Sequence, residues 1–219
     1  MNNKKAFIFD LDGVIVDTAK YHFLAWQKIA SELGIEFTPE ENENLKGVSR
    51  VRSLDIILEL GKITASQNDK DKWLIQKNED YLSYLVDMDQ SEILPGVMHI
   101  LQFLKEKDQF IALGSASKNA RPILEKTKIV DYFDAIVDGN DVTHAKPDPE
   151  VFVHAARLLK VSNENSIVFE DSVAGVQAAN IAKMTSIGIG DTKTLHEAQY
   201  IFPDFLHIDT SFIDAIINK

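Results

Sequence analysis

The sequence predicts an α/β protein with a Rossmann-like, three-layer core around a parallel sheet, interrupted by a small inserted domain of α-helices. Two observations support this prediction. Short apolar runs of strand length alternate with segments of helical spacing along most of the 219 residues, which is the pattern of a parallel sheet covered by helices. The first two runs are separated by about a hundred residues, far more than one crossover helix requires. The excess length indicates an insertion.

Five apolar runs have the length and the Ile, Val and Phe content of strands. They are residues 6–9, 110–114, 135–137, 166–169 and 185–189. The segments between them carry apolar residues at helical spacing, as at Val97, Ile100, Leu101 and Leu104. The last stretch, residues 191–219, carries no motif.

The first long interval contains only helical patterns. Three helices are predicted there, at residues 21–33, 51–60 and 68–86. Polar stretches at residues 12–18 and 87–95 flank them and predict two linkers that act as a hinge. We therefore expect a discontinuous core domain, residues 1–17 and 91–219, and an inserted cap domain, residues 18–90.

Composition excludes several classes of protein. With 34 acidic and 23 basic residues the net charge is −11, which disfavours nucleic acid and anionic membranes as partners. The chain contains no cysteine, so disulfides, thiolate metal sites and cysteine nucleophiles are excluded. No apolar run approaches the roughly 20 residues that span a bilayer, and the apolar run near the start is too short for a signal peptide. We expect a cytoplasmic monomer.

Polar side chains follow the predicted strands at the sheet edge where parallel sheets bind ligands. They are Asp10 and Asp12 after the first strand, Ser115 to Asn119 after the second, Lys146 before the fourth, and Glu170 and Asp171 after the fourth. Taken singly, each group has a structural interpretation as a turn, a helix cap or a proline-containing helix start. Together, in this order, they indicate one shared site.

This set of side chains suits phosphoryl transfer. Converging carboxylates repel one another unless a hard cation such as Mg²⁺ binds them, so Asp10 and Asp171 are candidate metal ligands. Asp10 can attack phosphorus and form an aspartyl-phosphate once positive charge masks the phosphoryl oxygens, and Lys146 and Ser115 fit that masking role. Asp12, two residues after the nucleophile, is placed to act as general acid and base.

The motifs resemble those of the haloacid dehalogenase superfamily of phosphotransferases. The matching stretches are Phe7-Ile8-Phe9-Asp10-Leu11-Asp12-Gly13-Val14, Ser115-Ala116-Ser117-Lys118, Lys146-Pro147 and Glu170-Asp171-Ser172. The inserted helices resemble the small helical cap of that superfamily. The resemblance implies a haloacid dehalogenase-like fold and a Mg²⁺ site that includes Asp10, Asp12, Glu170 and Asp171.

Within this superfamily, three segments of the insertion resemble the β-phosphoglucomutase family. They are residues 17–26, 45–50 and 77–81. The resemblance implies the interconversion of β-D-glucose 1-phosphate and β-D-glucose 6-phosphate through β-glucose 1,6-bisphosphate. It also implies that Thr18 and His22 couple cap closure to Asp12, and that Lys46 and Ser53 link the cap to the catalytic loop. The residues expected at the substrate are Gly47, Val48, Arg50 and Lys77 in the insertion, and Ala116, Ser117, Lys118 and Asn119 in the core.

The cap residues also have plain structural interpretations. Thr18 can be a helix cap, Lys46-Gly47 a helix end, and His22 and Arg50 exposed polar groups.

A mutase differs from a phosphatase in needing a second phosphate site. Ser115 and Lys146 form the first site beside the nucleophile. Arg50 from the insertion, with residues 117–119 from the core, offers a guanidinium group, an ammonium group and polar donors for the second. Two alternatives remain: a sugar-phosphate phosphatase of the same fold and a non-catalytic, receiver-like phospho-acceptor module.

Overall fold

The computed structural model describes residues 4–219 and contains a six-stranded parallel sheet of order β3-β2-β1-β4-β5-β6. The strands are β1 (Ala6–Phe9), β2 (Phe110–Gly114), β3 (Ala135–Val137), β4 (Ser166–Glu170), β5 (Thr185–Ile189) and β6 (Tyr200–Phe202). All five predicted strands are present, and β4 extends one residue beyond its prediction. The predicted α/β fold class is therefore confirmed.

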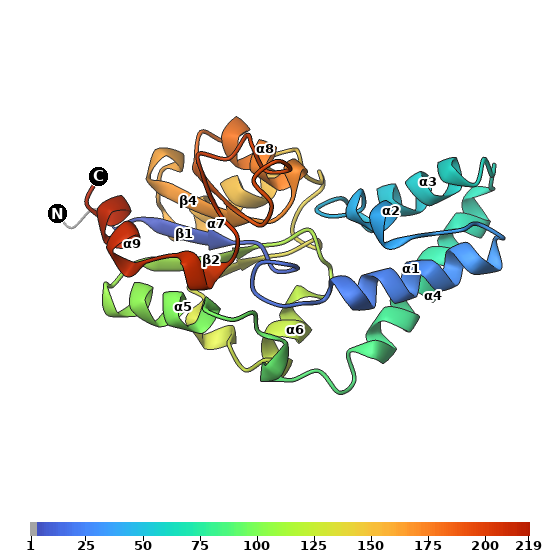
Figure 1. Ribbon diagram of the computed structural model, residues 1–219, viewed down its shortest axis with the longest axis horizontal. Coiled ribbons are helices and arrows are strands. Elements are labelled where there is room, and N and C mark those ends of the chain that lie inside the picture. Colours follow the sequence, from blue (N-terminus) through green and yellow to red (C-terminus); the bar gives the residue numbers. More distant parts are fainter. Residues whose placement is uncertain (1–3) are drawn as a thin grey trace.

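Strand β1 shows why this sequence folds into three layers. Phe7 and Phe9 pack into the cluster that contains side chains of α5, α6 and α9, whereas Ala6 and Ile8 pack with α7 and α8 on the other face. Because all four side chains are fully buried, the strand appears in the sequence as a continuous apolar run. Figure 1 shows helices on both sides of the sheet. The helices are α5 (Val97–Glu106), α6 (Ala120–Lys126), α7 (Glu150–Leu159), α8 (Val173–Ile181) and α9 (Thr210–Ile217).

The insertion forms a separate lobe of helices beyond the carboxyl ends of the strands (Figure 1). Its helices are α1 (Ala19–Glu32), α2 (Pro39–Glu43), α3 (Arg50–Leu60) and α4 (Gln67–Tyr84). They bury a cluster of their own around Trp26, Leu54 and Ile57. We call this lobe the cap and the remainder the core; the boundaries at residues 18 and 90 stay a prediction.

The two linkers between cap and core lie side by side. The backbone N–H of Asp17 donates to the carbonyl of Glu92 (3.0 Å), and that of Leu94 donates to the carbonyl of Ile15 (2.9 Å). The hydroxyl of Tyr21, in the first turn of α1, also donates to the Glu92 carboxylate at 2.7 Å. The cap is thus held to the core by a hydrogen-bonded pair of strand-like segments.

Several elements were not predicted. β6 has only three residues, all partly exposed at the edge of the sheet, so no apolar run indicates it. α2 begins at a capping box in which Thr38 and Glu41 satisfy each other's backbone N–H groups, a local signal that the helical spacing does not contain. Short 3₁₀ helices occur at Gln90–Glu92, Val130–Tyr132, Asn163–Asn165 and Phe205–His207. Within residues 4–219, no helix combines the length and the apolar character needed to cross a bilayer.

Candidate active site between cap and core

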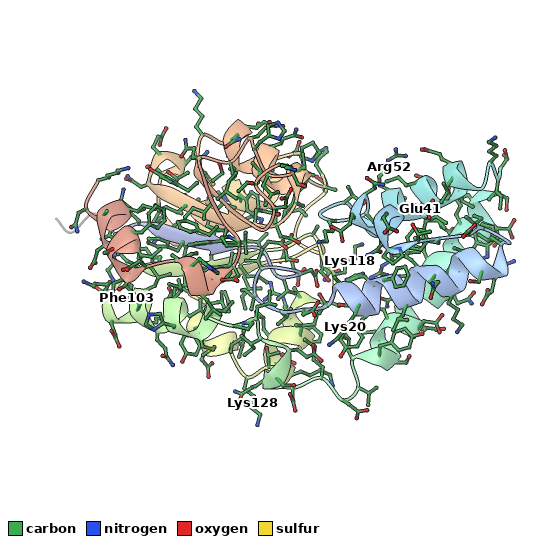
Figure 2. All side chains as sticks on the ribbon, viewed as in Figure 1. Lys20, Glu41, Arg52, Phe103, Lys118 and Lys128 are labelled. Atoms are coloured by element: carbon green, nitrogen blue, oxygen red, sulfur yellow. The ribbon has the colours of Figure 1, made fainter. Side chains whose placement is uncertain are left out.

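A cavity of about 620 Å³ lies where the carboxyl ends of the strands face the cap. Figure 2 shows Lys118 at this junction, between the sheet and the helices of the insertion. Every residue predicted for the site lines the cavity except Thr18 and Glu170, which are fully buried beside it. The topology therefore gathers residues from distant parts of the chain around one space.

Lys146 is paired with two carboxylates. Its Nζ donates to Oδ1 of Asp10 and to Oε1 of Glu170, both at 2.6 Å, and all three side chains are buried. Burial raises the pKa of Asp10 to about 7, although Lys146 acts against this rise. Burial also disfavours the charge on Lys146, but the two carboxylates outweigh it and raise the lysine pKa. Lys146 is therefore held as a cation next to the proposed nucleophile.

Glu170 is fully engaged by protein donors. Besides the bond to Lys146, its Oε2 accepts from the backbone N–H of Ser172 at 2.7 Å and from the Ser172 hydroxyl at 2.9 Å. Gly175 packs so closely on this carboxylate that a Cβ there would overlap it. These contacts favour Glu170 as an anchor for Lys146 over its predicted role as a direct metal ligand.

Asp171 faces the cavity together with Asp10 and is the better candidate to hold a metal. Its carboxylate packs against Gly13, whose φ of +78° and lack of a Cβ permit the approach. Burial, with Glu170 and Asp10 adding to it, raises the pKa of Asp171 well above its usual range. A divalent cation would relieve this repulsion, and carboxylate oxygens are ligands that Mg²⁺ prefers. Asp10 and Asp171 thus fit a magnesium ion.

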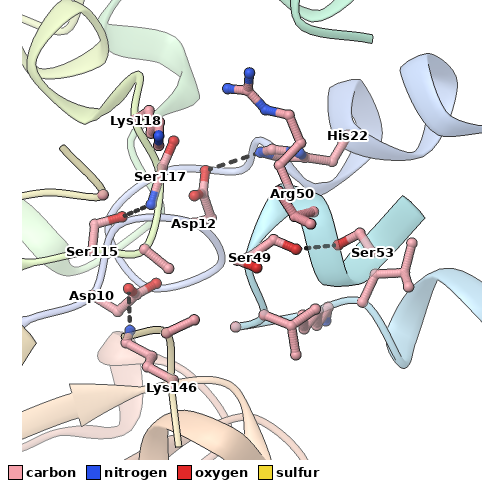
Figure 3. A pocket seen from close by; sticks show the side chains of 18 of the residues that line it. Asp10, Asp12, His22, Ser49, Arg50, Ser53, Ser115, Ser117, Lys118 and Lys146 are labelled. Atoms are coloured by element: carbon pink, nitrogen blue, oxygen red, sulfur yellow. Dashed lines mark hydrogen bonds and ion pairs between the residues drawn. The ribbon is translucent and has the colours of Figure 1, made fainter. Parts of the chain in front are cut away.

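The carboxylate of Asp12 points toward the cap. Its Oδ1 accepts a hydrogen bond from the Thr18 hydroxyl. The same oxygen lies 3.8 Å from Nε2 of His22 (Figure 3). Thr18 is the N-cap residue of α1, but its side chain makes no capping hydrogen bond and is directed to Asp12 instead. Burial raises the pKa of Asp12, and Thr18 acts against the rise. This placement suits proton transfer better than metal binding.

Lys77 of α4 occupies the cap side of the cavity without a carboxylate partner among the ion pairs of the described chain. Its Nζ lies 2.8 Å from Nδ1 of His22 and rests over the rings of Tyr81 and Trp26, at 4.6 and 5.1 Å from their centroids. Burial, increased by the charge of Arg50, lowers the pKa of Lys77 to about 7. Burial and these two cations likewise lower the pKa of His22 well below its usual value.

The loop before α3 brings the cap against the core. Gly47 has a φ of +71°, and a Cβ there would overlap the side chain of Ser172. Nζ of Lys46 lies 3.7 Å from Oδ2 of Asp171. Ser53, in contrast, donates its hydroxyl to the carbonyl of Ser49 at 3.2 Å, a bond within the cap and not to the catalytic loop (Figure 3).

The loop after β2 is held by its own serines. Ser115 accepts through Oγ from the backbone N–H of Ser117 at 3.1 Å, and Ser117 accepts from that of Asn119 at 3.3 Å. In Figure 3, Lys118 and Arg50 lie on the opposite side of Asp12 from Lys146. The cavity therefore offers cationic groups at two separated places.

Some contributing residues were not predicted. Glu150 accepts from the backbone N–H groups of Thr143 (3.0 Å) and His144 (2.7 Å), and so fixes the loop that leads to Lys146. Backbone bonding from His144 is the main cause that lowers the pKa of Glu150 to about 2. Trp26 also lines the cavity, and its position one helical turn after His22 could have indicated this.

Comparison with known proteins identifies the family. A family model described as haloacid dehalogenase-like hydrolase matches residues 4–183. The chain is 41% identical over 199 residues to beta-phosphoglucomutase of Bacillus subtilis strain 168, covering 90% of this chain and 88% of that one. It is 33% identical to a phosphorylated carbohydrates phosphatase of Thermotoga maritima, covering 89% and 91%.

Solved structures agree with these sequence matches. The 2.27 Å crystal structure of beta-phosphoglucomutase from Clostridium difficile superposes with a TM-score of 0.93 at 40% identity, covering 98% of this chain and 97% of that one. The shared architecture includes both the parallel sheet and the helical insertion, since the match extends over nearly the whole chain. The chain therefore belongs to the haloacid dehalogenase-like hydrolase family.

Proposed function

We propose that this protein is a β-phosphoglucomutase, which interconverts β-D-glucose 1-phosphate and β-D-glucose 6-phosphate through β-glucose 1,6-bisphosphate. The observation that carries the proposal is that cationic side chains suited to phosphate lie at two separated places around one cavity. Ser115 and Lys146 lie on the side of Asp10, and Arg50 and Lys118 lie across it. A bisphosphate needs both places, whereas hydrolysis of a monophosphate needs only the first. The relatives in Bacillus subtilis and Clostridium difficile support the same activity.

Mg²⁺ is typical of this family, and we propose Asp10 and Asp171 as its protein ligands. When bound, the ion would neutralise phosphoryl oxygens and reduce the repulsion between these carboxylates. Lys146 supplies a second positive charge that Asp10 and Glu170 hold in place.

The reaction follows from the two aspartates of the first loop. A carboxylate oxygen of Asp10 bonds to phosphorus while the bond from phosphorus to the sugar oxygen breaks. Asp12 gives its proton to that sugar oxygen, and its raised pKa favours the protonated form needed for this step. In the other half of the cycle, Asp12 takes the proton from the free hydroxyl of a glucose monophosphate, and that oxygen attacks the phosphoryl group on Asp10 and releases the Asp10 carboxylate. The bisphosphate formed in this way reorients before Asp10 takes its other phosphoryl group. Each half of the cycle leaves atoms and protons balanced.

Cap closure would favour the sugar hydroxyl over water as the acceptor. The hydroxyl of Thr18 and the ring of His22, both on α1 or at its start, stand next to Asp12. Gly47 allows the cap loop to touch the core at Ser172. A cap in this position encloses the cavity and removes bulk water from Asp12.

A coupled assay tests the proposal. β-Glucose 1-phosphate with Mg²⁺ and a trace of β-glucose 1,6-bisphosphate should yield glucose 6-phosphate, and the α-anomer should not. Release of inorganic phosphate without glucose 6-phosphate would instead identify a sugar-phosphate phosphatase. The phosphatase relative of Thermotoga maritima is the observation that favours this second candidate.

We also propose small sugar phosphates as the only class of partner, bound by a monomer in the cytoplasm. The net charge of −11 supports the absence of nucleic-acid and membrane partners. Attraction for an anionic substrate then has to come from local cations such as Lys118 and Arg50, together with the metal ion.

A further inference from the structure

Two asparagines join the cap to the core beside the second phosphate-binding place. Nδ2 of Asn119, in the core, donates to Oδ1 of Asn78, on α4 of the cap, at 3.0 Å. Asn119 lines the cavity, and Asn78 supports it from the cap side. Asn78 was not among the residues predicted for the site.

The side chain of Asn119 does not cap α6, although Asn119 stands at the N-cap position of that helix. It directly precedes α6, where an asparagine side chain commonly accepts a hydrogen bond from the first turn. Its side chain makes no such cap, and its backbone N–H is held by the hydroxyl of Ser117 at 3.3 Å. The backbone is therefore fixed by the loop, and the amide group is left to bond across to α4.

The direction of the bond between the asparagines determines what Asn119 can offer a ligand. An asparagine amide carries an oxygen that accepts and a nitrogen with two N–H donors. Oδ1 of Asn78 can only accept, so it binds the nitrogen of Asn119 and occupies one of its two N–H groups. The other N–H remains as a donor, which is what a phosphate oxygen requires.

We propose that Asn78 is a positioning residue for the second phosphate group of a sugar bisphosphate, and that it acts through the amide of Asn119. This inference rests on the proposed mutase function. Because one asparagine belongs to the cap and the other to the core, the bond can form only when the cap lies as close to the core as it does in this structure. Closure therefore orients a donor before the phosphate binds, and a donor oriented in advance loses less entropy on binding.

The test uses Asn78→Ala in the full chain, with Asp10→Asn added to every protein so that no phosphoryl transfer occurs. Binding of β-glucose 1,6-bisphosphate, measured by calorimetry with Mg²⁺ present, should weaken about five-fold, the usual effect of one neutral hydrogen bond. Gln76→Ala is the matched control, because its amide also lies on α4 but donates to Glu32 within the cap, at 2.7 Å. The Gln76→Ala variant should bind β-glucose 1,6-bisphosphate as tightly as the parent protein, which carries Asp10→Asn alone.

A double-mutant cycle separates a positioning role from a merely structural one. In an Asn119→Ala background, Asn78→Ala should cause no further loss of affinity, because its partner is already gone. The proposal would be overturned if Asn78→Ala weakened bisphosphate binding as much with Asn119→Ala present as without it. It would also be overturned if Asn78→Ala did not weaken binding when Asn119 is intact. Alanine has a higher helix propensity than asparagine, so α4 should remain folded. Asn78→Leu, which keeps the bulk and lacks the acceptor, should reproduce the result.

Kinetics with Asp10 intact provide an independent reading. Asn78→Ala should raise the bisphosphate concentration that gives half-maximal rate, with kcat at saturation unchanged. A fall in kcat alone would contradict the inference. If the parent makes no glucose 6-phosphate, the proposed function fails, whereas the calorimetric cycle still reports whether the asparagine pair supports phosphate binding.

Discussion

Lys146 and Lys77 border the same cavity with nearly equal burial, 4% and 2% exposed, yet their electrostatic surroundings are opposite. Lys146, in the core, lies 2.6 Å from each of two carboxylates. Lys77, in the cap, lies against the imidazole of His22 and two aromatic rings. The pKa of Lys146 is raised, and burial lowers that of Lys77 to about 7. Partners, and not burial alone, determine the charge of a buried lysine.

The difference in charge between the two lysines corresponds to a difference between the core and the cap. The core carries a cation that stays charged at any working pH, fixed beside the proposed nucleophile. The cap carries a lysine whose charge depends on what the cavity contains, because an anion nearby favours the protonated form. Replacing each lysine by methionine, whose unbranched side chain is one atom shorter and uncharged, tests the contrast directly.

Lys146→Met should have the largest effect. Loss of the positive charge next to the transferring phosphoryl group should lower kcat by about 10²- to 10³-fold or more. The same change leaves Asp10 and Glu170 buried without their cation, which should cost about 3–5 kcal/mol of unfolding free energy at pH 7. The coupled mutase assay measures the first effect and urea denaturation the second.

The control for this variant is Lys105→Met. Lys105 is an exposed lysine of the core domain that pairs with Asp134 at 3.0 Å, and exposed pairs contribute about 0–1 kcal/mol. Equal destabilisation by the two variants would show that the buried carboxylates do not depend on Lys146.

Lys77→Met should change stability with the opposite sign. Between pH 7 and its ordinary value of 10.5, the unfolded chain keeps the Lys77 proton and the native protein has released it, so native stability rises with pH. Below pH 7 both states bind the proton, and the native state carries the full cost of a buried charge. The methionine variant should therefore be more stable at pH 6, by an amount on the order of a few kcal/mol, with the gain fading toward pH 10.5.

Urea denaturation of both proteins from pH 6 to 10 measures this window. The neighbouring charged groups leave it interpretable: the lowered pKa of His22 keeps the imidazole neutral throughout, Arg50 keeps its charge, and Asp12 favours the charged lysine. A stability difference that does not vary with pH would show that Lys77 stays protonated in the native cap, and the contrast with Lys146 would fail.

The same two lysines show how far the sequence predicts this molecule. The position of Lys146 follows from topology, because parallel strands direct their carboxyl ends to one edge and continuous apolar runs mark the buried strands. The surroundings of Lys77 depend on how α1 packs on α4, which brings His22 to it across more than fifty residues, whereas Tyr81 lies one turn further along α4 itself. A motif can identify such a lysine, but whether a carboxylate pairs with it depends on the packing, and within residues 4–219 no carboxylate forms an ion pair with Lys77.

The smallest expected effect concerns the contact that sets the distance between the two parts. Gly47 and Gly34 share a φ of +71°, but a Cβ at Gly34 would have no neighbour within 4 Å, whereas one at Gly47 would overlap Ser172. Both alanine variants should lose about 1 kcal/mol of stability from backbone strain. Only Gly47→Ala should also push the cap loop from the core, raising KM for the sugar phosphate about ten-fold. Equal KM values in the two variants would mean that the protein can bind its substrate without this contact between the cap and the core.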